Sequence, residues 1–471
     1  MTPGARIRGF VLLAAAVVTG CAVGPNYERP KLTAPSSYRF QTGTTAESLA
    51  DLPWWKVFQD DPLHALVNDA LKSNFDLIVA SARVDESRAL ARAAGAQLLP
   101  SVSAASTGNY GNSLSGLGAT PQPFWAVNAT GNVSWEIDVF GRIRRNREVA
   151  RAQYAASEEE RRGVWVTVLA DVAQNYFQLL ALDLQRSIAD RTVTSRAELL
   201  DLFRVRAEGG VGTDLDVARA EADLYGAKDT LANAEQQIAL TENTIALLMG
   251  RTPGPIARSP TGDTLAEPPE VPAGLPSALL ERRPDVRQAE ANLVAANAQV
   301  GVATANLFPT VSLTALGGIV SNDLALVSQG GTNTSGVYSV GGSVNWLAPV
   351  LQGSQLRDQL DAQKKEWLAV RTTYIETVTR AFKDVADALV SLEKLRERRA
   401  ATAKQVAALS RALEVSRIQF DGGTATYLDV INAQEQLFPN ELSLAQLEGQ
   451  QLVAYVQLYR TLGGGWWLTQ R

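Results

Sequence analysis

The polar residues with the most suggestive spacing in this chain occur in two copies of one short motif. Each copy places a glycine pair before a Thr-x-x-Asp run, within residues 209–216 and 422–429; the polar members are Thr213 with Asp216 and Thr426 with Asp429. Glycine adopts the left-handed conformation that ends many helices, and Thr-x-x-Asp is a capping signal for the start of the next helix. Each copy therefore predicts a tight tip between two helices. The copies lie about 213 residues apart, which predicts a chain of two tandem halves.

Cys21 is the only cysteine of the chain, and it follows a segment with the features of a secretory signal. Residues 1–20 contain Arg6 and Arg8, no acidic residue and a short apolar run. Residues 18–21, Val-Thr-Gly-Cys, resemble the bacterial lipobox, which implies cleavage before Cys21 and lipidation of that residue. Each buried acyl carbon contributes roughly 0.8 kcal/mol, so several chains anchor a protein firmly. The alternative is an ordinary signal peptide followed by an incidental cysteine. Ala22, where an aspartate would indicate inner-membrane retention, favours the outer membrane.

The composition argues against several classes of function. The net charge of −5 over 471 residues gives no nucleic-acid footprint. A single cysteine forbids an intrachain disulfide, and a single histidine, His64, makes a His/Cys zinc site improbable. His64 has no cysteine or serine partner in a recognisable arrangement, and no phosphate-binding loop occurs. We therefore expect no enzyme and no cofactor, apart from the covalent lipid on Cys21. No apolar run past the N-terminus is long enough to span a bilayer as a helix.

The periodicity predicts the same order of elements in both halves. The expected elements of the first half are a helix from Pro62 to about Leu99, strands at 101–110 and 124–137, and helices at about 141–208 and 214–249. Those of the second are a helix at 278–306, strands at 310–320 and 336–347, and helices at 353–421 and 426–462. The long helices carry a narrow, coiled-coil-like apolar seam, which predicts a rod or tube rather than the alternative, a compact bundle.

These elements give the following expected organisation. A signal peptide at 1–20 precedes a lipidated, extended arm at 21–53 that lies on the surface of the body. The first repeat is 54–250, with a β-hairpin at about 101–137 and a tip at about 209–216. A Pro-rich linker at 251–277 leads to the second repeat, 278–463, with a β-hairpin at about 310–347 and a tip at about 422–429. Residues 464–471 form a C-terminal tail.

The strands predict an oligomer. Each is roughly ten residues long, the length of a transmembrane β-strand, and aromatic residues such as Tyr110, Trp135, Tyr338 and Trp346 lie near the strand ends. The alternative is a soluble β-cap. If the strands enter lipid, four per chain cannot close a barrel, because known barrels start at about eight strands. An open edge is not tolerated in hydrocarbon, so protomers must share one barrel, and three would supply twelve strands.

Several long motifs carry a resemblance to a known family. They are residues 21–30, the Trp54-Trp55 segment through Pro62, the Arg282-Arg283-Pro284-Asp285 run with its continuation to Glu290, and both tips. With them, the chain resembles the TolC-like outer membrane factors, specifically the NodT or OprM-like lipoprotein branch. The resemblance implies a mainly α fold with a membrane β-barrel part, in which a homotrimer forms a twelve-stranded barrel continued by a periplasmic α-helical barrel. It also implies an outer-membrane exit duct that is served by a periplasmic adaptor and an inner-membrane pump and gated at its periplasmic tip.

The resemblance also suggests gate residues. Asp216 and Asp429 match tip aspartates of the family, and three copies of each around an axis would form rings of like charge that select cations. The alternative is that they only cap helices together with Thr213 and Thr426. Three other tip positions depart from the family: Phe420 replaces a frequent tyrosine, Ala425 a charged latch residue and Asn432 a second aspartate. We therefore expect coiled-coil packing, more than charge pairs, to hold the tip.

The leading hypothesis is an exit duct for drugs or other small molecules, whose identity the sequence does not reveal. The alternatives are a type I protein secretion duct and a non-conducting structural coiled-coil lipoprotein. A tether does not need two symmetrically placed hairpins, and the lipobox favours the pump-linked branch over protein secretion. Arg282 and Arg283 are expected to orient a helix start, and Trp54 and Trp55 to be packing anchors.

Overall fold

A computed structural model describes residues 22–32, 35–40, 51–113, 122–260, 262, 264–265, 278–321, 334–346 and 350–464. Cys21, the signal segment and most of the Pro-rich linker lie outside these residues, as do positions 465–471. The chain divides into two compact units. Unit 1 contains Met1–Lys31, Arg83–Ser157 and Gln288–Tyr374, and unit 2 contains Leu32–Ala82, Glu158–Arg287 and Ile375–Arg471.

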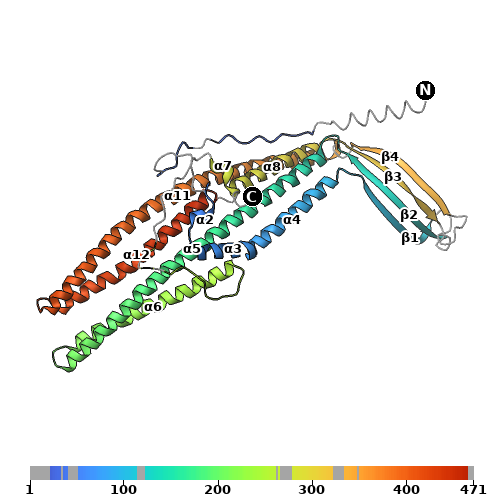
Figure 1. Cartoon of the computed structure of the whole chain (residues 1–471). Coiled ribbons are helices and arrows are strands. Elements are labelled where there is room, and N and C mark those ends of the chain that lie inside the picture. The colour runs from blue at the N-terminus through green and yellow to red at the C-terminus, as the bar shows by residue number, and fades with distance from the viewer. Residues whose placement is uncertain are drawn as a thin grey trace. The chain divides into compact units, whose positions relative to one another are not determined.

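The order of helices and strands repeats, as the sequence predicts (Figure 1). The first half contains α2 (Trp54–Val57), α3 (Asp61–Ser73), α4 (Phe75–Ala96), β1 (Ser101–Ser113), β2 (Gln122–Ile137), α5 (Arg142–Glu208) and α6 (Asp214–Leu248). The second contains α7 (Leu279–Arg282), α8 (Pro284–Ala305), β3 (Thr310–Ser321), β4 (Thr334–Asn345), α11 (Gly353–Asp421) and α12 (Tyr427–Thr461). Among the described residues, no helix combines the length and apolar character needed to cross a membrane.

Two predicted helices are each broken once. The helix expected from Pro62 to Leu99 ends at Ser73, because Asn74 is extended (φ −63°, ψ 131°). Its side-chain oxygen accepts a hydrogen bond from the Leu77 N–H at 3.1 Å and so caps α4. The helix expected at 278–306 is likewise interrupted at Arg283, which is also extended. Both predictions of a single helix were wrong. At Asn74 an apolar period continues through one non-helical residue. At Arg283 the break precedes Pro284, where a new helix starts, as expected of this run.

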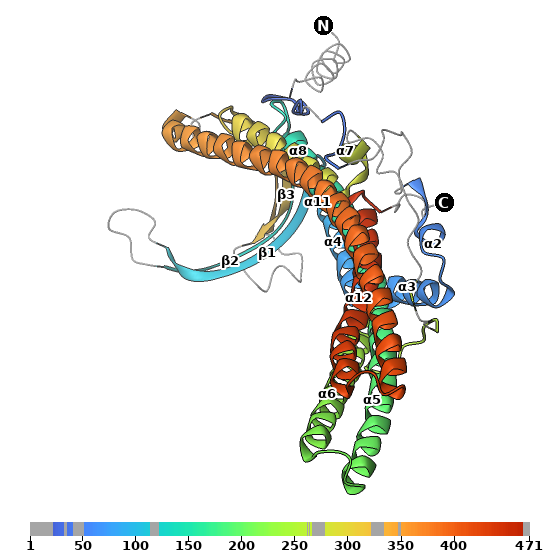
Figure 2. The same cartoon turned by 90° about the vertical axis from the view of Figure 1, so that its left-hand side faces the viewer.

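Unit 1 contains a four-stranded antiparallel sheet in the order β1-β2-β3-β4, and its strands curve along their length (Figure 2). The edge strands are exposed on both faces: every residue from Ser101 to Tyr110 is exposed, and Tyr338 and Val340 of β4 are 89% and 83% exposed. Within the part of the chain that is described, the outer edges of β1 and β4 pair with no other strand. Over the described residues, the sheet therefore has two open edges.

Residues 22–31, at the start of unit 1, form neither helix nor strand and lie along α5 and α8. Arg145 of α5 is buried and donates to the Val23 carbonyl oxygen at 3.2 Å and to the Asn26 side chain at 2.9 Å. Asn297 of α8 donates to the Pro25 carbonyl oxygen at 3.0 Å. The bonds to Val23 and Pro25 satisfy backbone carbonyl oxygens that a strand or helix would otherwise pair. The position of the arm on the helices is thus fixed by side chains that lie far away in the sequence.

Unit 2 contains two helical hairpins, α5 with α6 and α11 with α12, whose tips lie at the same end (Figures 1 and 2). Their core includes Tyr176, Tyr455 and Tyr459, with Trp54 and Phe58 packed in from the segment before α3. Burial of each large apolar side chain stabilises the fold by about 1.5–3 kcal/mol. The packing role expected of Trp54 is confirmed, since it is 3% exposed. Trp55 packs on Trp54 in a T-shaped pair at 5.8 Å between ring centroids but is 40% exposed, so it is a weaker anchor than Trp54.

Arg283 has the structural role predicted for it. Its buried guanidinium pairs with Asp285 at 2.7 Å and with Asp384 of α11 at 3.1 Å. It also donates to the Thr461 carbonyl oxygen at the end of α12, at 3.2 Å. One charge thereby connects the start of α8 to both helices of the second hairpin. A buried charge needs such partners, because an unpaired one is strongly unfavourable.

Candidate functional site

The two tips have the same backbone hydrogen bonds. In the first, Val211 N–H donates to the Arg206 carbonyl oxygen at 2.9 Å; in the second, Thr424 N–H donates to that of Gln419 at 2.9 Å. The second glycine of each pair takes the left-handed conformation, with φ 76° at Gly210 and 70° at Gly423. A Cβ at either glycine would meet no atom within 4 Å. These glycines are therefore required by the backbone angle and not by crowding.

Thr213 and Asp216 form the cap of α6. The Asp216 carboxylate accepts from the Thr213 hydroxyl at 2.6 Å and from its backbone N–H at 3.2 Å, while the Thr213 hydroxyl oxygen accepts from the Asp216 N–H at 3.2 Å. The hydrogen bond from the Thr213 hydroxyl is the main cause that lowers the pKa of Asp216, and Arg219 and Arg206 add to it. The carboxylate is thus held ionised at the start of a helix, where a negative charge is favourable.

Thr426 and Asp429 repeat this cap at the start of α12. The Asp429 carboxylate accepts from the Thr426 hydroxyl at 2.8 Å and from its backbone N–H at 3.0 Å. Asp429 and Asn432 are both exposed. Four predicted gate residues are therefore grouped as one Thr/Asp cap at each tip. Asn432 lies one turn further along α12, and Phe420 lies at the end of α11.

A cluster of aromatic rings joins the two hairpins just behind the tips. Tyr427, the first residue of α12, lies edge-on to Phe203 of α5 at 4.4 Å between ring centroids and to Phe420 of α11 at 5.2 Å. The Arg206 guanidinium lies over the Phe420 ring at 5.5 Å. Phe420 was singled out in the sequence only as a replacement for tyrosine. Phe203 and Tyr427 were missed, because nothing in either pattern indicates that the two residues meet.

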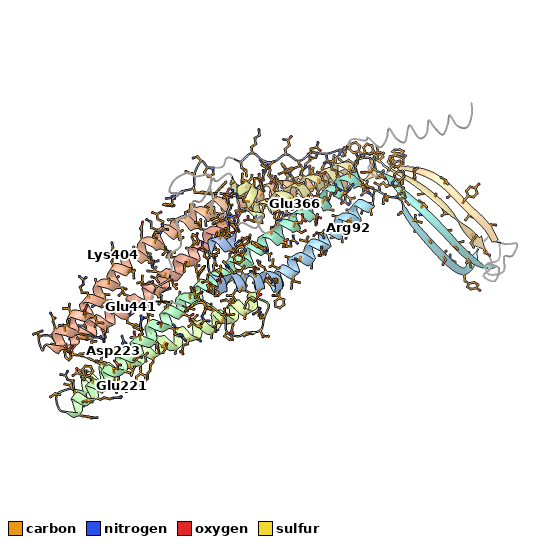
Figure 3. The ribbon with its side chains drawn as sticks, viewed as in Figure 1. Arg92, Glu221, Asp223, Glu366, Lys404 and Glu441 are labelled. Atoms are coloured by element: carbon orange, nitrogen blue, oxygen red, sulfur yellow. The ribbon has the colours of Figure 1, made fainter. Side chains whose placement is uncertain are left out.

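Two grooves lie between α5 and the second hairpin. One, of about 280 Å³, is lined by Leu199, Leu202, Arg417, Phe420 and Tyr427 among others. The other, of about 240 Å³, is lined by Arg191, Arg196, Arg417 and Glu441 among others. Burial raises the pKa of Glu441, and Arg191 opposes that rise. Figure 3 shows Glu441 on α12 and Asp223 on α6, whose carbonyl oxygen accepts from Arg196 at 2.6 Å.

Comparisons with known proteins agree with this architecture. The sequence profile of the outer membrane efflux protein family matches residues 66–251 and 275–464, one segment in each half. The cation efflux system protein CusC of Escherichia coli is 30% identical over 457 residues, which are 96% of this chain and 97% of that protein. The solvent efflux pump outer membrane protein SrpC of Pseudomonas putida is 31% identical, over 99% of this chain and 100% of that protein. The solved structure of the outer-membrane channel OprN superposes with a TM-score of 0.86 at 31% identity, covering 95% of this chain and 100% of that one.

The repeated hairpins, the exposed sheet and these matches define a channel protein of the outer membrane. The chain belongs to the outer membrane efflux protein family, whose TolC-like members are transport ducts and not enzymes. The family resemblance seen in the sequence is confirmed. The roles predicted for Cys21 and for the tip aspartates stay predictions.

Proposed function

We propose that three copies of this chain form the outer-membrane exit duct of a tripartite efflux system, fed by a periplasmic adaptor and an inner-membrane pump. The exposed sheet of unit 1 is the observation that carries the trimer. The outer edges of β1 and β4 pair with no strand among the described residues, and an open edge in lipid leaves its N–H and C=O groups without partners. Edge-to-edge pairing with neighbouring copies would satisfy those groups, and twelve strands from three copies would close the sheet.

The cargo we propose is small molecules. The relatives are described as exporting cations or solvents, and their likeness extends over nearly the whole of each chain. This favours a pump-linked duct over type I protein secretion. A non-conducting tether has no use for a sheet whose edge strands are exposed on both faces, so the structural alternative is disfavoured by the same feature.

The tip aspartates are proposed to line the gate as rings of negative charge. Asp216→Asn with Asp429→Asn removes the charge but leaves an oxygen that accepts the capping bonds. In planar bilayers, the double variant is expected to raise the single-channel conductance or to change its dependence on the cation. Asp214→Ala, which removes an exposed charge of the first tip outside the capping box, is the matched control. Conductance identical to that of the wild type in every cation would leave these aspartates as caps only.

The membrane anchor is proposed to be a lipid on Cys21. Since this is the only cysteine, Cys21→Ser should abolish incorporation of radioactive palmitate. Insertion of the sheet does not require the lipid, so part of the variant protein should still be found in the outer membrane. Palmitate labelling that persists in the variant would contradict the anchor without touching the proposal of a duct.

A further inference from the structure

We propose that Tyr427 is the latch that joins the two helical hairpins of unit 2 behind the gate, and that its buried hydroxyl keeps this latch easy to release. The inference rests on the proposed function, because it assigns to the tip region the control of a duct. It concerns a residue outside both caps.

The geometry makes Tyr427 a connection between hairpins. Leu200, Phe203, Ala220 and Leu224 form a separate buried cluster between α5 and α6, and the Tyr427 ring packs against it from α12. Its other neighbour is Phe420, which lies before the second tip in its own hairpin. A side chain of the second hairpin thus completes the core of the first. Aromatic pairs at such distances attract one another beyond the effect of burial alone.

The two capping aspartates do not join the hairpins. Asp216 and Asp429 are each bonded within their own cap, and Ala425 and Phe420 have side chains that donate no hydrogen bond. In the first tip, the position equivalent to Tyr427 is Asp214, which is exposed. The ring contact therefore belongs to the second tip alone and is not a product of the repeat.

The Tyr427 hydroxyl opposes the contact that its ring makes. Its oxygen is buried and forms no hydrogen bond with any described residue. Burial raises the pKa of this hydroxyl, against the nearby charges of Arg417 and Arg196, so it stays neutral. A buried donor without a partner destabilises the state that buries it. The groove of about 280 Å³ that Tyr427 lines lies beside it, so separation of the hairpins would expose the hydroxyl to water.

Opposite effects are therefore expected from two substitutions at one position. Tyr427→Phe keeps the ring and removes the unpaired hydroxyl, so the open probability in planar bilayers should fall by roughly fivefold. Tyr427→Ala and Phe203→Ala remove the ring contact, so each should raise the open probability by about tenfold or more. Tyr225 of α6 is 58% exposed and lies outside the cluster, so Tyr225→Phe and Tyr225→Ala are the matched controls and should change nothing.

Amide hydrogen exchange tests the contact between the hairpins without any measurement of conductance. Tyr427→Ala should speed amide hydrogen exchange in residues 199–206 of α5, across the contact, while Tyr427→Phe should slow it. In the double variant Phe203→Ala with Tyr427→Ala, exchange should be little faster than in either single variant, because both substitutions remove the same contact. A Tyr427→Phe protein that opens as often as the wild type or more often would overturn the role of the hydroxyl. Unchanged exchange at 199–206 in Tyr427→Ala would overturn the latch. If the wild type conducts nothing, the duct proposal fails, and the exchange result still decides the latch.

Discussion

The two tips share a backbone and differ in what surrounds it. Both end a helix at a left-handed glycine, and both start the next helix with a threonine whose aspartate partner lies three residues on. Only the second tip is followed by a ring that enters the core of the other hairpin. The turn therefore needs only glycine and a cap, whereas the contact of the second tip with the core of the first hairpin depends on a side chain, Tyr427, that the repeat does not fix.

The largest difference between the tips is expected when each first helical residue, Asp214 or Tyr427, is replaced by its counterpart from the other tip. Tyr427→Asp would place a carboxylate among apolar rings, at a cost of about 3 kcal/mol or more, because both the ring packing and the hydration of the charge are lost. Asp214→Tyr alters an exposed position and should change stability by less than about 0.5 kcal/mol. Thermal unfolding of the two single variants measures the difference. Equal destabilisation by both would contradict the asymmetry between the tips.

Alanine at the left-handed glycines should show what the tips share. Gly210→Ala and Gly423→Ala should each destabilise by about 1 kcal/mol, because the backbone angle is unfavourable for a residue with a Cβ. Gly226, within α6, has open space and no positive φ, so Gly226→Ala should instead stabilise by about 0.5–1 kcal/mol. Denaturant unfolding distinguishes the signs. A clear difference between Gly210→Ala and Gly423→Ala would mean that the backbones are not equivalent.

Acid should weaken the cap at the first tip. The pKa of Asp216 is lowered in the folded chain, chiefly by the Thr213 hydroxyl, so its contribution to stability is present above the usual aspartate pKa of about 3.9. That contribution is lost as pH falls through the lower, folded pKa. Amide exchange at Val217, corrected for the intrinsic effect of pH, should speed up below about pH 4. Asp216→Asn should remove this pH dependence, and its persistence in that variant would assign it to another group.

Much of the fold was predictable because it depends on local chemistry. Glycine pairs, Thr-x-x-Asp caps and a seam with steps of three and four residues indicate where helices end, begin and pack, and the long helices have the expected bounds. The break at Arg283 follows from local chemistry, because Pro284 marks a helix start and disfavours helix at the residue before it. The break at Asn74 was not predictable in this way. Asn74 leaves the helix because its amide also donates to the Leu248 carbonyl oxygen at 2.9 Å, in a segment 174 residues away.

The sequence by itself determined the doubled plan, the positions of both tips and the family, since these follow from short motifs and their period. Only the tertiary structure decided which residues meet behind the tips. Phe203 and Tyr427 are more than 200 residues apart, and their contact depends on how two hairpins pack side by side. Periodicity describes one helix at a time, so a side chain that completes a neighbour's core is visible only when both helices are in place.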